Sequence, residues 1–249
     1  MTDSLALYSA RRGLGILGGT FDPVHAGHLC LARAALDAVP LVRVELMPAG
    51  EPWQKSRISP GIHRLNMLRI AVEYEPQCRI NTSELCRSGA TYTIDTVSRL
   101  REEVGPDMPL VLILGSDQWF NLSTWREWQS LTDFVHIAYC ARDGVRESEI
   151  PESQALWAAP RMTEARKLVF SPSGRIARFE MAPHRASATA IRRTLAREPF
   201  ARAMSSLDGW LDPGVASYIR THGLYQPARH EPQVKHEHRR THPARRQRP

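Results

Sequence analysis

Near the middle of the chain stands an unbroken run of five apolar residues, Leu110–Leu114 (LVLIL). A strand with one face in water alternates apolar and polar residues, so a strand without alternation is buried on both faces. Such burial is typical of the central strands of parallel sheets, which helices cover on either side. The run therefore predicts an α/β fold built around a parallel sheet.

On both sides of this strand, short apolar runs alternate with longer amphipathic stretches, the pattern of successive βα units. Further strands are predicted at residues 14–17, 42–47, 79–82, 135–139 and 177–181. Helices are predicted at residues 28–39, 61–74, 92–104 and 189–196. A last helix is predicted to begin at Asp212-Pro213, a cap residue followed by proline, and to end at Gly223. Right-handed crossovers make a Rossmann-like, doubly wound parallel sheet with a small C-terminal helical part the expected fold.

Local patterns add three expectations. Ile62 and three other apolar residues place one face of the 61–74 helix against the core. Thr91 or Thr93 is available to cap the next helix. Residues 144–160 are polar and irregular, which indicates an excursion on the surface.

The charge of the chain is concentrated at its C-terminus. The 249 residues contain 33 Lys and Arg against 26 Asp and Glu, a formal charge of +7, and the pI is about 9.6. Residues 227–249 carry +5 of this charge and contain few apolar side chains, so we expect a disordered basic tail. Residues 1–12 are expected to form an N-terminal extension and residues 13–226 the folded domain. The tail leaves open a nucleic acid or another polyanion as a partner.

The composition excludes several classes of protein. With 42% hydrophobic and 24% charged residues, the chain is too apolar for global disorder. No apolar run approaches the roughly 20 residues of a membrane helix, and Asp3 stands where a signal peptide carries positive charge. The cysteines form no C-x-x-C pair, so neither a zinc ribbon nor a disulfide framework is indicated and a cytoplasmic location is expected. They are Cys30, Cys78, Cys86 and Cys140.

The strongest chemical signal lies in residues 18–28, GGTFDPVHAGH, between the first predicted strand and the first helix. A glycine turn that enters a helix presents backbone N–H groups and the positive end of the helix dipole to an anion. The spacing of His25 and His28 places both imidazoles on one helix face, and Gly27 leaves room for a nucleotide. Two such histidines can stabilise charge that develops in phosphoryl transfer. Taken alone, the pair also fits polar residues at a helix start or a histidine satisfied in the core.

A second segment of this kind, SATAIR, occupies residues 187–192. Ser187 and Thr189 are placed to cap a helix start, and Arg192 offers a bidentate cation from the first turns of that helix. Capped helices with an early arginine are common, so this segment alone indicates no more than a helix.

Together the two segments resemble the signatures of the nucleotidylyltransferase superfamily, G-x-F-D-P-x-H-x-G-H and S-[ST]-T-x-I-R, in the same order. The resemblance covers residues 14–225 and is closest to the bacterial nicotinate-nucleotide adenylyltransferases. It implies that His25 and His28 are catalytic. It also implies an ATP site formed by Gly18, Gly19, Thr20, Phe21, Lys55, Asp117, Ser187, Thr189 and Arg192.

The same resemblance implies a nicotinate mononucleotide site, in which the indole of Trp125 stacks on the pyridine ring. The implied residues of this site are Tyr92, Thr93, Thr124, Trp125 and Arg142. Arg64 occupies the place of the family's helix arginine. The chain departs from the family pattern at three positions, where it has Gln54, Gln118 and Asp143. The other aromatic residues near Trp125 are expected to be structural; they are Trp119, Phe120 and Trp128.

By this resemblance the chain is an enzyme of NAD biosynthesis, which joins ATP and nicotinate mononucleotide to give nicotinate adenine dinucleotide and pyrophosphate. The sequence contains no carboxylate cage for a resident metal, so Mg²⁺ is expected to arrive with ATP. Two kinds of alternative stay open. One is another nucleotidylyltransferase, such as a pantetheine-phosphate adenylyltransferase or a cytidylyltransferase, and the other is a nucleic-acid-binding protein that uses its basic tail. The preference for nicotinate over nicotinamide mononucleotide is also open.

Overall fold

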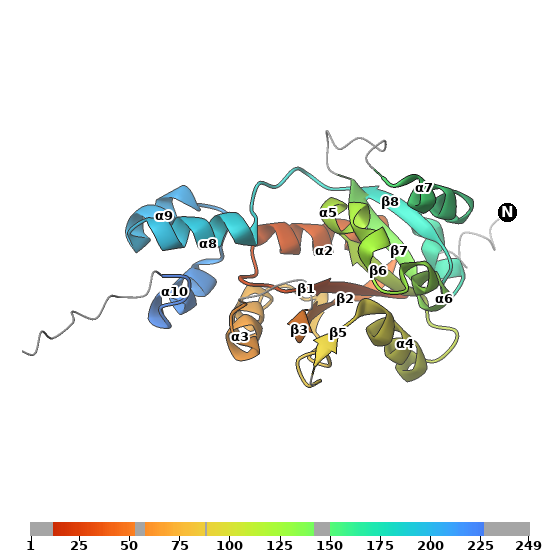
Figure 1. Cartoon of the computed structure of the whole chain (residues 1–249), viewed down its shortest axis with the longest axis horizontal. Helices are drawn as coiled ribbons and strands as arrows, with labels where there is room; N and C mark the ends of the chain where they lie inside the picture. The colour runs from red at the N-terminus through yellow and green to blue at the C-terminus, as the bar shows by residue number, and fades with distance from the viewer. Residues whose placement is uncertain (1–11, 53–57, 88, 142–149, 227–249) are drawn as a thin grey trace, which may run out of the picture.

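The computed structural model describes residues 12–52, 58–87, 89–141 and 150–226. Six parallel strands form one sheet in the order β4-β2-β1-β6-β7-β8, with helices on both faces (Figure 1). This is the doubly wound, Rossmann-like architecture that the sequence predicts. The strands of the sheet are β1 (Gly13–Gly19), β2 (Leu41–Pro48), β4 (Cys78–Ile80), β6 (Leu110–Leu114), β7 (His136–Ala141) and β8 (Ile176–Glu180), while β3 (Glu51–Pro52) and β5 (Ala90–Thr91) pair separately.

The helices follow the strands in the alternation expected of βα units. They are α2 (Ala26–Ala38), α3 (Gly61–Ala71), α4 (Thr93–Val104), α5 (Ser116–Phe120), α6 (Leu131–Phe134), α7 (Glu152–Ala158), α8 (Ala188–Arg197), α9 (Phe200–Ser206) and α10 (Pro213–Thr221). In the described part of the chain, none of them is long and apolar enough to cross a membrane.

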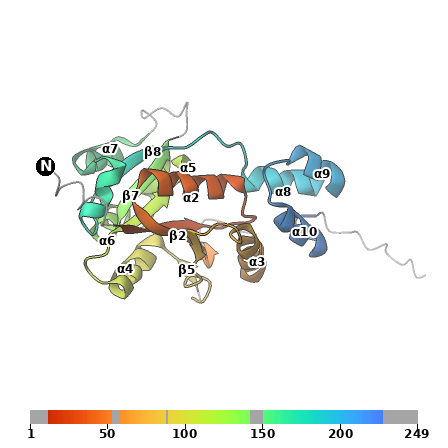
Figure 2. The same cartoon turned by 180° about the vertical axis from the view of Figure 1, so that it is seen from behind.

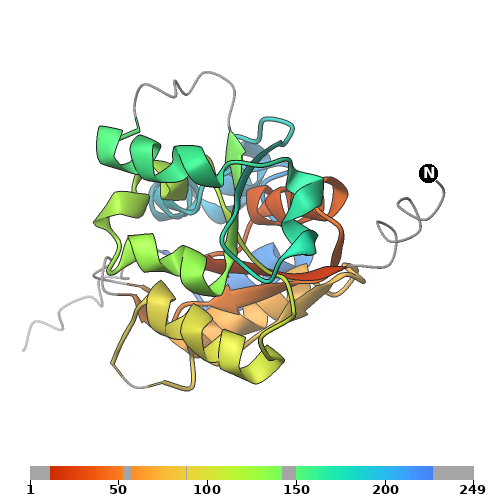
Figure 3. The same cartoon turned by 90° about the vertical axis from the view of Figure 1, so that its right-hand side faces the viewer.

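The period of two along each strand divides the interior into two hydrophobic clusters. In β6, Val111 and Ile113 point into the cluster beneath α2, and the three leucines point into the cluster beneath α4 and α5. Figure 3 shows β1 and β2 passing between α2, in red, and α4, in yellow. All five residues of β6 are buried, as the unbroken apolar run predicts. Each fully buried leucine contributes about 1.5–3 kcal/mol relative to an exposed one.

The C-terminal helices α8, α9 and α10 lie beyond the end of the sheet, beside the start of α2 and beside α3 (Figures 1 and 2). Two of them begin with the caps that the sequence predicts. The hydroxyl of Ser187 accepts from the Ala190 N–H at 3.2 Å at the start of α8. The Asp212 carboxylate accepts from the Gly214 N–H at 2.7 Å and from the Val215 N–H at 3.2 Å at the start of α10.

The structure corrects the expectations for the helices on either side of β4 and β5. The predicted 61–74 helix ends at Ala71, and Ile62 is 57% exposed, whereas Arg64 on the opposite side of the pattern is buried. Neither Thr91 nor Thr93 caps α4, because Tyr92 is its N-cap residue and makes no side-chain capping bond.

The largest correction concerns residues 144–160, where the sequence predicts an irregular excursion. Residues 142–149 lie outside the described residues, but α7 follows them. Its buried residues are Gln154 and Ala158. The Gln154 amide donates to the Trp119 carbonyl at 2.7 Å and accepts from the Ser123 N–H at 3.2 Å, so a polar residue is buried where an apolar one would have marked the helix. The short helix α9 was not predicted either, for a different reason: Ala203 is its one fully buried residue, so the helix shows no repeating pattern of buried apolar positions.

Candidate active site

The loop between β1 and α2 carries the first predicted motif. Gly18 and Gly19 end β1, His25 is the N-cap residue of α2, and His28 lies in its first turn. The two imidazole rings stack with centroids 3.7 Å apart and planes 28° apart. The predicted pair on one side of a helix start is thus present.

A hydrogen bond fixes the tautomer of His28. The backbone N–H of His25 donates to Nδ1 of His28 at 3.2 Å. A neutral imidazole that accepts at Nδ1 carries its proton on Nε2. The ring of Phe21 contacts the His28 ring edge-on, with centroids 4.9 Å apart. His28 is therefore oriented as an N–H donor at Nε2 by neighbours on both of its sides.

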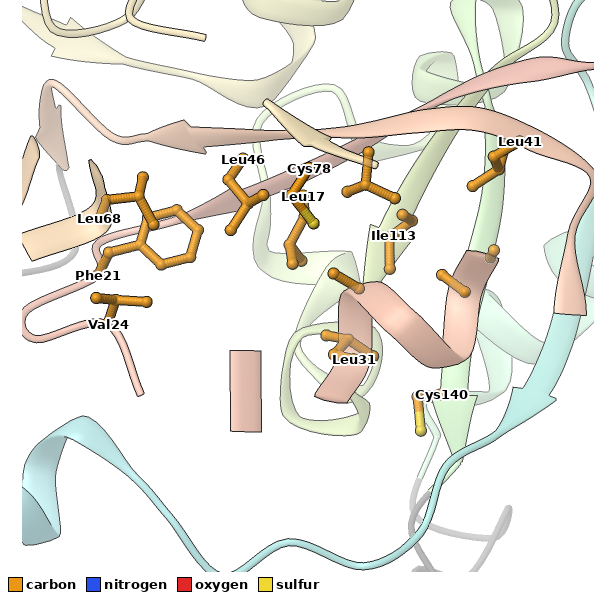
Figure 4. Close-up of a cluster of buried hydrophobic side chains, with 14 of the residues drawn as sticks. Leu17, Phe21, Val24, Leu31, Leu41, Leu46, Leu68, Cys78, Ile113 and Cys140 are labelled. Atoms are coloured by element: carbon orange, nitrogen blue, oxygen red, sulfur yellow. The ribbon is translucent and has the colours of Figure 1, made fainter. Parts of the chain in front are cut away.

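Phe21 anchors this loop in the core. Its side chain is 1% exposed and belongs to the cluster beneath α2, where Figure 4 shows Phe21, Val24 and Leu68 at one end. A Cβ on Gly19 would lie 3.1 Å from the Phe21 ring, so the glycine leaves space for the aromatic side chain. Phe21 has a φ of +50°, a left-handed conformation that costs about 1–3 kcal/mol for a residue other than glycine. The loop therefore needs contacts that hold it in this shape.

The structure brings the second predicted motif to the same loop. A guanidinium N–H of Arg192 donates to the Asp22 carbonyl at 2.6 Å, and its second nitrogen donates to Oγ1 of Thr189 at 3.4 Å. A Cβ on Gly27 would lie 3.1 Å from the His25 ring and 3.4 Å from the Ala186 carbonyl oxygen. Gly27 thus permits the start of α2 to pack closely against the chain that enters α8. The N-termini of two helices, each favourable to anions, meet beside the loop.

A buried arginine ties this loop to its neighbours. Arg64 is 1% exposed, and its guanidinium donates to three backbone carbonyls, those of Thr20, Gly50 and Ser59, each at 3.0 Å. Burial lowers the pKa of Arg64, and the nearby Asp22 carboxylate opposes that shift. Gly50 and Ser59 lie on either side of residues 53–57, which are outside the described residues. Gln54 and the predicted phosphate ligand Lys55 belong to this segment.

The end of β6, the strand next to β1 in the sheet, leads first to a residue predicted for the ATP site and then to residues predicted for the nicotinate site. Asp117, predicted for the ATP site, is exposed in the first turn of α5; because α5 directly follows β6, Asp117 lies at the carboxyl edge where open α/β sheets bind ligands. The Thr124 hydroxyl donates to the Asn121 carbonyl at 2.7 Å, and Trp125 is half-buried against the cluster beneath α4. Arg142 and Asp143 lie outside the described residues.

Tyr92 lies beside the segment that contains Trp125. It precedes α4, whose first residue is Thr93, and the guanidinium of Arg126 lies 5.0 Å from the centroid of its ring. Arg126, which follows Trp125, therefore contacts Tyr92, the first residue of the other segment predicted to line the nicotinate site. By contrast, Trp119 is a core residue: it is 2% exposed and stacks on Tyr139 with centroids 4.2 Å apart.

Sequence reasoning missed two further residues that hold the site together. The Glu84 carboxylate accepts from the Thr96 hydroxyl at 2.7 Å, and burial raises the pKa of this carboxyl group. The main-chain carbonyl of Glu84 lies so close to Gly50 that a Cβ there would clash with it. The second residue is Tyr225, whose hydroxyl donates to the carboxylate of Asp22 at 2.6 Å. No spacing or composition marks either residue. Among the described residues, no group of three or more His, Cys, Asp and Glu could hold a metal ion.

Comparisons with known proteins identify relatives of this chain. The cytidylyltransferase-like family model matches residues 16–194. The chain is 42% identical over 215 residues to a probable nicotinate-nucleotide adenylyltransferase of Bordetella petrii, covering 86% of this chain and 98% of that protein. It is 38% identical over 218 residues to a protein of the same name from Laribacter hongkongensis, covering 87% of this chain and 96% of that protein.

The fold is also found in solved structures. Plasmodium falciparum nicotinic acid mononucleotide adenylyltransferase, complexed with NaAD, has a TM-score of 0.64 at 19% identity and covers 86% of this chain and 97% of its own. On the sequence relationships above, the chain belongs to the nicotinate-nucleotide adenylyltransferase family, within the cytidylyltransferase-like group.

Proposed function

We propose that the protein transfers the adenylyl group of MgATP to nicotinate mononucleotide in the cytoplasm, giving nicotinate adenine dinucleotide and pyrophosphate for NAD biosynthesis. The observation that carries this proposal is the stacked His25–His28 pair, which lies where the N-termini of α2 and α8 meet. The names of the relatives supply the substrates.

The reaction asks for positioning and charge stabilisation rather than for a protein nucleophile. A phosphate oxygen of nicotinate mononucleotide attacks the α-phosphorus of ATP in line, and the bond to the bridging oxygen breaks, so its electron pair leaves with pyrophosphate. The attacking phosphate is already an anion near neutral pH, so no strong base is needed. In this scheme Nε2–H of His28 donates to an α-phosphoryl oxygen as negative charge develops there, and His25 lies alongside.

The proposed ATP site surrounds this pair. The loop from Gly18 to Phe21 offers backbone N–H groups to the triphosphate, and the start of α8 offers side chains. Asp117 accepts from a ribose hydroxyl at the carboxyl edge of the sheet. Mg²⁺ is bound by the phosphates of ATP and enters as part of that substrate. The residues proposed for the triphosphate are Lys55, Ser187, Thr189 and Arg192.

We expect Trp125→Ala to raise the KM for nicotinate mononucleotide about tenfold, because stacking on an aromatic side chain contributes about 1–3 kcal/mol per ring. The KM for ATP should stay within twofold of its value in the unchanged protein. Steady-state kinetics with each substrate varied in turn measures both constants. Trp128→Ala is the matched control, since that indole packs edge-to-face on Trp157, with centroids 4.8 Å apart. A rise in the KM for ATP in place of that for the mononucleotide would contradict the assignment of Trp125 to the nicotinate pocket.

The function itself is tested by pyrophosphate release. Turnover is compared for ATP with nicotinate mononucleotide, with nicotinamide mononucleotide and with phosphopantetheine, and for CTP in place of ATP. The proposal requires the first combination to have the highest kcat/KM. Faster turnover with phosphopantetheine or with CTP would assign the chain to a different transfer reaction. A polyanion partner for residues 227–249 is a separate prediction, which requires salt-sensitive binding that is lost when those residues are deleted.

A further inference from the structure

The C-terminal end of the folded chain returns to the loop that carries the histidines. The Tyr225 hydroxyl donates to Oδ1 of Asp22 at 2.6 Å, and the Ser59 N–H donates to Oδ2 of the same carboxylate at 3.1 Å. The Asp22 carbonyl accepts from Arg192 at 2.6 Å. Asp22 is 2% exposed, so these bonds are made away from bulk water, where a hydrogen bond to a charged group is stronger than in solvent.

Backbone strain is concentrated at the same place. Three residues other than glycine have a positive φ in the described part of the chain, and two of them are Phe21 at +50° and Tyr225 at +62°. Phe21 directly precedes Asp22, and Tyr225 holds the Asp22 carboxylate. Such conformations persist only where surrounding contacts enforce them, and they cluster at functional sites. The bond between Asp22 and Tyr225 therefore joins two strained points of the backbone.

We propose that Tyr225 is a positioning residue, whose hydroxyl acts through Asp22 to hold the loop from Thr20 to His25 in its catalytic geometry. The proposal rests on the adenylyl transfer proposed above. It assigns a task to the end of the C-terminal helical part, since Tyr225 lies beyond residue 194, where the matched family model ends. The three C-terminal helices then do more than cover the end of the core: they deliver a hydrogen-bond donor to the phosphate-binding loop.

The hydroxyl is suited to this task at every pH at which the enzyme would be assayed. Burial raises the pKa of Tyr225, and the bond to Asp22 raises it further. The phenol therefore stays protonated and continues to donate. The charged groups that surround it are Asp22 and Arg192, with Arg64 behind the loop.

The test uses Tyr225→Phe with Tyr218→Phe as its matched control in the full-length protein. The Tyr218 hydroxyl also comes from the C-terminal part, but it bonds to α3, where it accepts from Asn66 Nδ2 at 3.1 Å and lies 3.0 Å from His63 Nδ1. We expect Tyr225→Phe to lower kcat about tenfold or more, the scale of one lost hydrogen bond to a charged group. The KM for nicotinate mononucleotide should stay within twofold. Tyr218→Phe should leave kcat within twofold at a similar shift of the unfolding temperature.

A double-mutant cycle shows whether Tyr225 acts through Asp22. In an Asp22→Asn background, adding Tyr225→Phe should change kcat less than twofold, since the partner of the hydroxyl is already altered. Independent effects of the two substitutions would overturn the proposal. So would unchanged kcat in Tyr225→Phe, or equal losses of kcat in Tyr225→Phe and Tyr218→Phe.

Amide hydrogen exchange separates this proposal from the proposed function, because it needs no turnover. Peptides that cover residues 20–28 should exchange at least tenfold faster in Tyr225→Phe and at the original rate in Tyr218→Phe. Unchanged exchange in Tyr225→Phe overturns the positioning role even in an active enzyme. Absence of pyrophosphate release by the unchanged protein overturns the adenylyl transfer instead.

Discussion

Replacement of His28 by alanine is expected to lower kcat at least ~10²-fold in the pyrophosphate-release assay, with little change in either KM. Loss of one preorganised donor to developing charge has about this effect in other enzymes. His28 is oriented by the His25 N–H at its Nδ1 and by the ring of Phe21, so the donor is in place before substrate arrives. Alanine removes the donor, and it also removes the acceptor of the His25 N–H.

Two further substitutions show whether Nε2 or Nδ1 of His28 is the nitrogen required for catalysis. The amide nitrogen of glutamine reaches close to the position of Nε2, and that of asparagine reaches close to Nδ1. We therefore expect His28→Gln to retain more activity than His28→Asn. His222→Ala is the control, because that ring stacks on Tyr218, with centroids 3.9 Å apart, at the end of α10. Turnover near that of the unchanged protein in His28→Ala would remove His28 from the mechanism.

Arg64→Met is expected to lower the free energy of unfolding by about 3–5 kcal/mol, the cost of removing one partner from a buried charged network. The carbonyls of Thr20, Gly50 and Ser59 would lose their donor, and the buried Asp22 carboxylate would lose a nearby cation. Urea denaturation followed by circular dichroism measures this change.

Arg69→Met is the matched control for Arg64. Arg69 lies on the same helix, is exposed, and donates to Asn66 Oδ1 at 3.2 Å, so its loss should change stability by about 0.5 kcal/mol or less. Arg64→Lys should fall between the two, because a single ammonium group cannot reproduce the geometry of the guanidinium fork. If Arg64→Met were as stable as Arg69→Met, the three hydrogen bonds from Arg64 to main-chain carbonyls would make no net contribution to the free energy of unfolding.

The central strand and the starts of two helices could be predicted because their signals are local. Leu110–Leu114 is apolar at every position, and Ser187 and Asp212 accept from backbone N–H groups one turn into their helices. Prediction failed where a buried position holds a polar side chain. Gln154 in α7 and Arg64 in α3 are both buried and donate to main-chain carbonyls of distant segments, those of Trp119 and Thr20, which no periodicity of apolar residues can show.

The site divides in the same way. Its two motifs are continuous in sequence, so their residues could be named in advance, and the contact between Arg192 and Asp22 joins them. Tyr225 could not be named, because its role depends on a hydrogen bond to a residue 203 positions away. The path of the chain through α9 and α10 creates that bond. The catalytic and binding roles of all these site residues stay predictions, and Lys55 and Arg142 also lie outside the described residues.

The bonds made by Arg64 have a consequence for how this enzyme can diversify. Its guanidinium binds Gly50 and Ser59 through their main-chain carbonyls, which every amino acid possesses. The two ends of the intervening segment are thus secured by a device that is indifferent to the sequence between them. We therefore expect substitutions between these two positions, Gln54 among them, to leave both bonds in place.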